Sequence, residues 1–349
     1  MTERLYPLRR PEGHVPPVPR YSASLERCGE RLVALFAGVQ AETPAALKAS
    51  GLRAWVESVR DLADGPAHGD WAAFTDPRGF LNRVAALYWP DSRCFERWKE
   101  LPAVAEWRSG VGRLGAPWGS WWEPVAVPVE RTETIAFKEY RRGLSACPFG
   151  GLVPTEGSGY WGAARDRIPA SAYDPLDGDV GRLERLPEPP RSRGRHLAIR
   201  PPAGMAVIRS GVSWAACGEE QRRSFETNVR PKLDAGMEHL RRAPEETGCC
   251  SLRQMAATDG DGRPLEEGYS LGAFLSLGHL ERWARHHPAH LAIHNRAMAE
   301  RKKYQERLEL RTYNEIYVTD RHSHVFEYVN CHEGTGLIPF FAALAPQGG

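Results

Sequence analysis

Four histidines stand close together in the segment HHPAHLAIHN, residues 286–295. Pro288 predicts that a helix begins there and runs to about residue 309, because the first helical turn does not need the N–H that proline lacks. His290 and His294 are then four residues apart and share one face of the helix. A neutral imidazole is a ligand for zinc and for haem iron. The segment is therefore a candidate metal site.

Three interpretations of these histidines compete. A zinc pair needs a third ligand, and the Glu of an HExxH motif is missing. Ordinary packed or solvated histidines at a helix start are the commoner case. An axial haem ligand requires only one imidazole on a helix that faces an apolar cavity. The spacing alone does not choose among them.

The composition predicts a soluble, cytoplasmic protein that acts on a small molecule. The chain of 349 residues has 46 Lys and Arg against 44 Asp and Glu, a net charge of +2, so it lacks the basic excess of a nucleic-acid or membrane-surface binder. Seven cysteines without a CxxC motif indicate neither a disulfide framework nor a thiolate zinc site. No apolar run approaches the ~20 residues of a membrane span, and the start lacks the apolar stretch of a signal peptide. A homodimer is compatible with this composition.

The chain divides into two similar halves. Two stretches rich in proline and charge suggest the boundaries. They predict an N-terminal arm (1–24), a first half (25–173), a Pro/Arg-rich connection (174–204) and a second half (205–349).

Each half repeats an order of strand, helix, strand and helix. The matching pairs are 32–40 with 205–214, 45–60 with 218–242, 80–89 with 269–277, and 94–98 with 279–283. A repeat of this kind predicts a duplicated α+β unit with antiparallel sheets. Chance likeness between short amphipathic segments is the alternative.

The differences between the halves indicate where the chemistry lies. Ala37 of the first half matches Ser210 of the second, and Val104 matches His290. Both inert positions thus carry polar, reactive residues in the second copy. We expect the active site to belong mainly to residues 205–332.

Several segments together resemble the haem-containing aldoxime dehydratases, also called phenylacetaldoxime dehydratases. They are ALYW (86–89), GYWGAARDRI (159–168), IRSG (208–211), SLGHLERW (276–283), HPAHLAI (287–293), FEYVNCH (326–332) and TG (335–336). The resemblance implies two ferredoxin-like halves, in a dimeric α/β-barrel-like arrangement, around one b-type haem. It also implies a lyase that binds an aldoxime through nitrogen to the haem iron and eliminates water to give a nitrile.

The resemblance assigns roles to individual residues. His290 matches the proximal iron ligand, and Ser210 matches the distal serine that holds the substrate hydroxyl. Arg167, in preference to Arg165, matches the distal arginine, and Glu133 matches the acidic member of the set. The last three have plainer alternatives. Ser210 could be a turn or cap residue, Arg167 could pair with Asp166 or Asp174 on the surface, and Glu133 could lie on a solvated strand face. For Trp89, Trp98, Trp161 and Trp283 the plainer role is core packing, and a haem wall is the second.

The sequence departs from the family at Asn314, where relatives carry the histidine that acts as acid and base. An amide does not shuttle protons near neutral pH. The candidates to replace it are His294, Glu315, His322 and His324. Two other functions therefore remain open: a diverged haem enzyme that makes or breaks another N–O or N–N bond, and a non-catalytic haem binder or sensor on the same fold.

Overall fold

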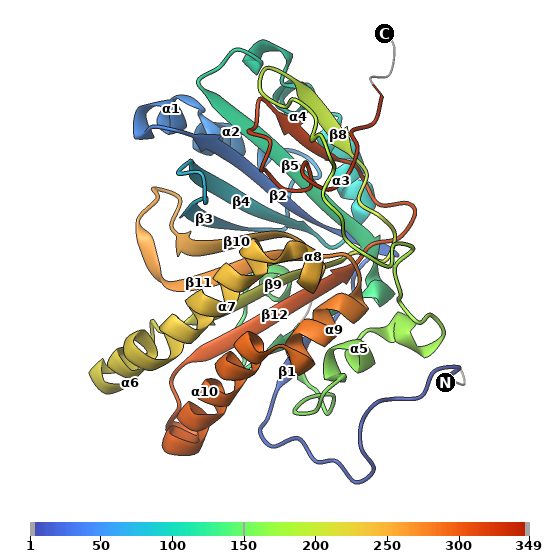
Figure 1. The fold of residues 1–349 in the computed structure, drawn as a ribbon, viewed down its shortest axis with the longest axis vertical. Coiled ribbons are helices and arrows are strands. Elements are labelled where there is room, and N and C mark those ends of the chain that lie inside the picture. Colours follow the sequence, from blue (N-terminus) through green and yellow to red (C-terminus); the bar gives the residue numbers. More distant parts are fainter. Residues whose placement is uncertain (1–3, 149–150, 346–349) are drawn as a thin grey trace.

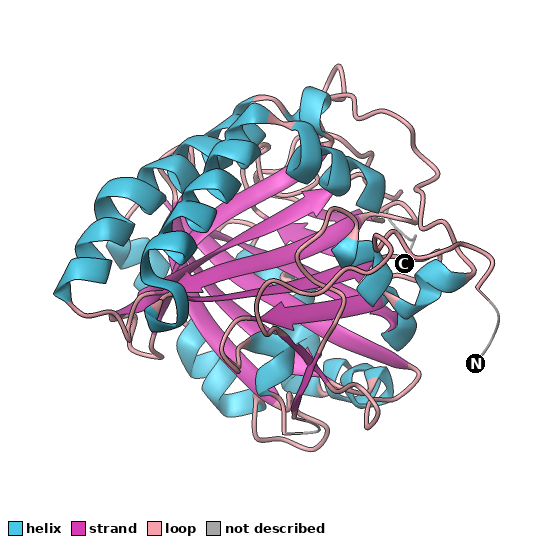
Figure 2. Cartoon of the chain, turned by 90° about the horizontal axis from the view of Figure 1, so that it is seen from below, coloured by secondary structure: helices cyan, strands magenta, loops and turns pink. Residues whose placement is uncertain are grey.

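The computed structural model describes residues 4–148 and 151–345. Residues 1–3 of the predicted arm and 346–349 of the predicted second half lie outside them. In the described residues thirteen strands form one sheet, in which every paired strand runs antiparallel to its neighbour. Helices cover the outer sides of this sheet, as Figure 2 shows. The chain is thus an α+β protein.

Eight central strands fall into two groups of four. The first half contains β2 (Arg31–Ala41), α1 (Pro44–Ala49), α2 (Leu52–Val59), β3 (His68–Thr75), β4 (Leu81–Trp89), α3 (Ser92–Lys99), α4 (Pro102–Ser109) and β5 (Trp118–Pro128). The second contains β9 (Ala206–Ser213), α6 (Glu219–Ser224), α7 (Arg230–Arg242), α8 (Pro244–Thr247), β10 (Cys249–Thr258), β11 (Pro264–Phe274), α9 (Leu277–His286), α10 (Pro288–Tyr304) and β12 (Arg311–Val318). The spatial orders are β5-β2-β4-β3 and β12-β9-β11-β10, so the halves have matching topology (Figure 1).

The strand–helix–strand–helix prediction was incomplete. Each half has two further strands. In the first half these are β3, which pairs with β4, and β5, the last strand of the group. In the second half they are β10, which pairs with β11, and β12, the last strand of the group. The two halves meet where β3 pairs with β10, with Ala72 opposite Ala257. This pairing makes a single sheet of the two groups.

Shorter strands extend the sheet at both ends and tie the halves together. They are β1 (Tyr21–Ala23), β6 (Thr132–Ala136), β7 (Leu152–Pro154), β8 (His196–Ile199) and β13 (Phe326–Val329). β6, which lies within the predicted first half, pairs with β12 of the second. β13, which lies within the predicted second half, pairs with β5 of the first. Each half therefore depends on strands from elsewhere in the chain.

Two matched glycines support the alignment of the halves. Gly38 lies opposite Trp121 in β5, and Gly211 lies opposite Tyr313 in β12. A Cβ atom at Gly38 would meet the Trp121 ring at 2.1 Å, and one at Gly211 would meet the Tyr313 ring at 2.2 Å. Glycine is thus required at both places because an aromatic ring lies on the backbone.

The residues beside these glycines differ in size between the halves. Ala37 lies opposite Ala85 and Trp122, and the large indole of Trp122 packs among Trp55, Trp98 and Phe95. Trp98 is fully buried and stacks on Trp122 with ring centroids 6.0 Å apart. Aromatic side chains therefore fill the space between sheet and helices in the first half.

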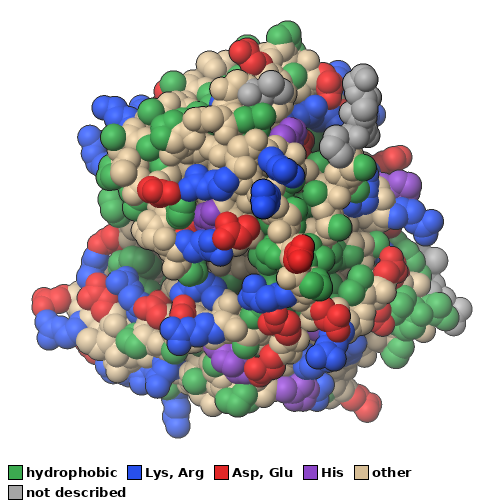
Figure 3. All heavy atoms as spheres, turned by 45° about the horizontal axis from the view of Figure 1, so that its top comes forward, with side chains coloured by type: hydrophobic (Ala, Val, Ile, Leu, Met, Phe, Trp, Pro, Cys, Tyr) green, Lys and Arg blue, Asp and Glu red, His purple; other side chains and the backbone are tan. Residues whose placement is uncertain are grey.

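The surface carries no large patch of one charge on the face drawn in Figure 3, where acidic and basic side chains alternate. This agrees with the small net charge. In the described residues no helix combines the length and the apolar character that crossing a bilayer would require.

Candidate active site

The five residues selected from the sequence line one cavity of about 340 Å³. It lies between the sheet of the second half and the helices α7, α9 and α10 that cover it. The residues are Glu133 of β6, Arg167 of α5 (Ala163–Arg167), Ser210 of β9, His290 of α10 and Asn314 of β12. Elements far apart in the chain thus bring them together, and their roles stay predictions.

His290 lies in the first turn of α10. The helix begins at Pro288, as predicted, and the His287 side chain caps it by accepting from the Ala289 N–H at 3.2 Å. Burial lowers the pKa of His290 to about 4, and the Ala284 carbonyl offsets only part of this effect. The imidazole is therefore neutral near pH 7, which is the form that binds a metal.

The helix ends earlier than predicted, at Tyr304, because Gln305 has a positive φ of 49°, which breaks the right-handed helical backbone. His294 is one turn beyond His290, with its ring 5.1 Å from that of Trp161. It is not among the described residues that line the cavity. His290 does line the cavity, and its ring centroid lies 5.9 Å from that of Trp283. The geometry thus favours His290 over His294 as the ligand.

A row of three small polar residues faces the cavity from the sheet. Ser210 pairs directly with Asn314 on one side and with Ser270 on the other. All three line the cavity. Sequence reasoning missed Ser270, although it occupies the position that matches Ala85 of the first half. Where the first half has Ala, Ala and Trp, the second has Ser, Ser and Asn.

Arg167 and Glu133 form a buried ion pair at the edge of the cavity. The Arg167 Nε donates to Glu133 Oε2 at 2.8 Å, and the side chains are 10% and 1% exposed. Arg167 also donates to the Gly157 carbonyl at 2.5 Å. Among the described residues, the second carboxylate oxygen, Glu133 Oε1, is buried without a hydrogen-bond partner. The pair therefore leaves one carboxylate oxygen unpaired in the wall of the cavity.

The plainer alternatives for Arg167 do not occur. Asp166 accepts hydrogen bonds from Tyr160 and from the Arg9 backbone, and Asp174 pairs with Arg131. Arg165 pairs with Glu281 at 2.7 Å and is not one of the described residues that line the cavity. Of the two arginines, only Arg167 thus reaches the cavity.

None of the four candidates for the missing histidine is among the described residues that line the cavity. Successive strand residues point to opposite faces, so Glu315 lies behind the sheet from Asn314. There it accepts from the Leu144 N–H at 2.6 Å and from Tyr317 at 3.1 Å. His324 pairs with Glu96 at 2.7 Å and His322 is exposed, so neither takes over the role of the histidine.

The residues present fit a haem. Apolar side chains from α7, α9, α10 and the sheet make up much of the cavity wall: Ile208, Leu233, Met237, Leu240, Leu252, Phe274, Leu277, Leu280, Trp283, Ile293 and Ile316. Trp161 and Trp283 line the cavity, and their role as a haem wall stays a prediction, whereas Trp89 and Trp98 belong to the first-half core. One neutral imidazole on the helix side, with hydrogen-bonding groups on the sheet side, is the pattern of a haem pocket with a distal ligand site.

The fold and the cavity thus define a haem enzyme, and comparison with known proteins gives its family. Residues 35–337 match the family described as haem-containing dehydratase. The chain belongs to this family, whose cofactor is haem, and the resemblance found in the sequence is confirmed.

Characterised relatives agree along nearly the whole chain. The aliphatic aldoxime dehydratase of Pseudomonas chlororaphis is 36% identical over 338 residues, with 95% of this chain and 93% of that protein covered. The phenylacetaldoxime dehydratase of Bacillus sp. (strain OxB-1) is 32% identical over 341 residues, which are 97% and 95% of the two chains. A crystal structure of an aldoxime dehydratase in complex with butyraldoxime has a TM-score of 0.89 and 30% identity, and covers 97% of this chain and 94% of that one.

We predict that replacing His290 by Ala abolishes haem retention, because the substitution removes the neutral imidazole that faces the cavity. His294→Ala is the matched control and keeps haem. The measurement is the haem-to-protein ratio of purified protein with intact secondary structure. Retention in His290→Ala together with loss in His294→Ala would reverse the assignment.

We predict that Arg167→Met destabilises the fold by about 3–5 kcal/mol, because it leaves a buried Glu133 carboxylate without its counter-charge. Glu133→Gln in the same chain removes that charge and recovers much of the loss. Chemical denaturation of the two single variants and the double variant measures the coupling. If the two effects simply add, the pair contributes no interaction free energy.

Proposed function

We propose that this protein is a haem-dependent aldoxime dehydratase. In the proposed reaction an aldoxime or a related N-oxygenated compound loses water and yields a nitrile. The observation that carries the proposal is the row Ser210, Ser270 and Asn314, which faces His290 across an apolar cavity. The similarity to aldoxime dehydratases over at least 95% of this chain supports it.

His290 holds the haem, which supplies, when bound, an iron site for the substrate nitrogen and electron density for the departure of the hydroxyl. Ser210 donates to the substrate hydroxyl from the sheet side. Asn314, its direct neighbour in β12, supplies an amide that both donates and accepts. The row thereby orients the N–O bond, and the apolar wall excludes water.

Glu133 is our candidate for the proton transfer that the resemblance assigns to a histidine at the position of Asn314. Glu133 lines the cavity, Arg167 holds its Oε2, and its Oε1 is buried with no partner among the described residues. We assign Glu133 to proton transfer at the substrate and Arg167 to holding that carboxylate in place.

A second function has one specific feature in its favour. Asn314, which the resemblance matches to the family's acid–base histidine, lines the cavity, and a neutral amide suits a substrate that needs orientation more than protonation. A haem enzyme that makes or breaks another N–O or N–N bond would use such a site. Loss of dehydration with retention of nitrogen-ligand binding would favour it.

We also propose that the two halves are duplicated ferredoxin-like units, with the boundaries 25–173 and 205–349. Their strand orders, β5-β2-β4-β3 and β12-β9-β11-β10, support this. So do the matched glycines, Gly38 and Gly211, each beneath an aromatic ring.

The function is tested with the full-length, haem-loaded protein reduced by dithionite. Addition of an aliphatic or aromatic aldoxime is expected to shift the Soret band and to produce the nitrile, which is measured by gas chromatography. Ser210→Ala keeps haem but forms nitrile much more slowly. A Soret shift without nitrile from either class of aldoxime contradicts dehydration as the reaction.

We predict that Asn314→His raises the rate of nitrile formation by about 10²-fold or more, because general acid–base catalysis contributes gains of this size. Asn314→Gln, which keeps an amide, is the control and gives no gain. Steady-state rates over a range of pH provide the measurement. An unchanged rate in Asn314→His would mean that this position does not face the reacting atoms.

A further inference from the structure

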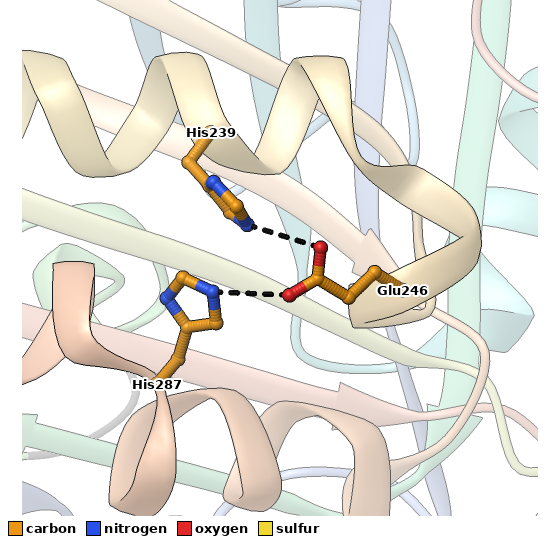
Figure 4. Close-up of side chains that lie close together, drawn as sticks. All are labelled: His239, Glu246 and His287. Atoms are coloured by element: carbon orange, nitrogen blue, oxygen red, sulfur yellow. Dashed lines mark ion pairs between the residues drawn. The ribbon is translucent and has the colours of Figure 1, made fainter.

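A second cluster of potential ligands lies outside the cavity, behind Trp283. His239 of α7, Glu246 of α8 and His287 between α9 and α10 converge there (Figure 4). Glu246 is 3.7 Å from His239 Nε2 and 3.3 Å from His287 Nε2, and the candidate ligand atoms all lie within 4.8 Å of one another. The three residues come from three separate elements, so local sequence does not force them together.

The donor atoms are available. His239 Nε2 is buried and has no hydrogen-bond partner in the part of the chain that the structure describes. Among the described residues, Glu246 forms ion pairs with these two histidines and with no Lys or Arg. Its neighbour Glu245 is instead paired with Arg185. The cluster thus combines an unused imidazole nitrogen with a carboxylate that no permanent cation neutralises.

We propose that His239, Glu246 and His287 bind a divalent transition-metal ion of the zinc class, with water at a fourth position. Two imidazoles and one carboxylate are a recurrent zinc donor set. The 3.3 Å separation matches the edge of a tetrahedron with metal–ligand bonds of about 2.0–2.1 Å. The 3.7 Å separation between Glu246 and His239 is longer than this edge, and the exposed Glu246 side chain has room to shorten it.

Binding has an identifiable cost at the start of α10. His287 Nδ1 accepts the Ala289 N–H, so in the ion-free protein the imidazole hydrogen is on Nε2, toward Glu246. An ion on Nε2 moves that hydrogen to Nδ1 and removes this cap. One N-cap bond is weak compared with a structural zinc site. The ion and the cap therefore exclude each other, three residues before His290.

The position of the site suggests its effect. The His287 ring stacks on Trp283, with ring centroids 4.4 Å apart. The Trp283 ring in turn lies edge-on to the His290 ring, with centroids 5.9 Å apart. An ion here would link α7, α8 and the start of α10. The three residues take no part in the proposed reaction, so zinc binding and nitrile formation are tested separately.

The test is calorimetric titration of Zn²⁺ into the tag-free, haem-loaded protein after treatment with EDTA. We expect one ion per chain at this site and a rise in the thermal unfolding temperature. Glu246→Gln weakens Zn²⁺ binding at least about tenfold. His287→Asn does the same while its side-chain oxygen still caps α10. Glu245→Gln, on the same helix but outside the cluster, leaves binding unchanged.

Two results would overturn the proposal. If wild-type protein takes up no Zn²⁺, the three residues form only an ion-paired histidine–glutamate cluster. Zinc bound equally well by wild type, Glu246→Gln and His287→Asn lies elsewhere. Anomalous diffraction at the zinc absorption edge locates the ion independently of either variant.

Discussion

The space between the second-half sheet and its helices depends on small side chains at three neighbouring strand positions. In the first half the equivalent row ends in Trp122, which stacks on Trp98 and fills the layer. In the second half the row is Ser210, Ser270 and Asn314, and a cavity of about 340 Å³ remains. Protein interiors are close-packed, so such a space persists only where something other than side chains occupies it. Haem, the family's cofactor, meets that need.

This constraint also explains how the polar groups are distributed. Burial keeps His290 neutral on the helix side, with its pKa lowered to about 4. On the sheet side, the ion pair of Arg167 and Glu133 compensates its own charges in an apolar setting. The cavity therefore holds a metal ligand on one wall and donors and acceptors on the other. The remaining ionisable candidate, Glu315, lies behind the sheet in a separate buried network with Tyr88 and Tyr317.

Short sequence patterns predicted the features that depend on neighbouring residues, namely where helices and strands begin. Pro288 marked the start of α10, and the apolar runs around Ala37 and Ser210 marked β2 and β9. The comparison of halves pointed to the site because it exposed differences at matched positions. The pairing of β3 with β10 and of β13 with β5 could not be predicted, since long-range register leaves no periodic signal in either segment. Ser270 was missed for the same reason: its importance comes from its neighbours across the sheet.

Side-chain size at position 314 decides whether the cavity can hold a haem, and Asn314→Trp tests this most directly. The substitution installs the tryptophan that the first half has at the matching position, Trp122. Trp122 stacks on Trp98 in the first half, and the residue that matches Trp98 in the second half is Trp283. The haem-to-protein ratio is measured on variant protein whose circular dichroism and unfolding transition show a folded chain. We predict folded protein with little or no haem. Folded Asn314→Trp protein with a wild-type haem content would contradict the account.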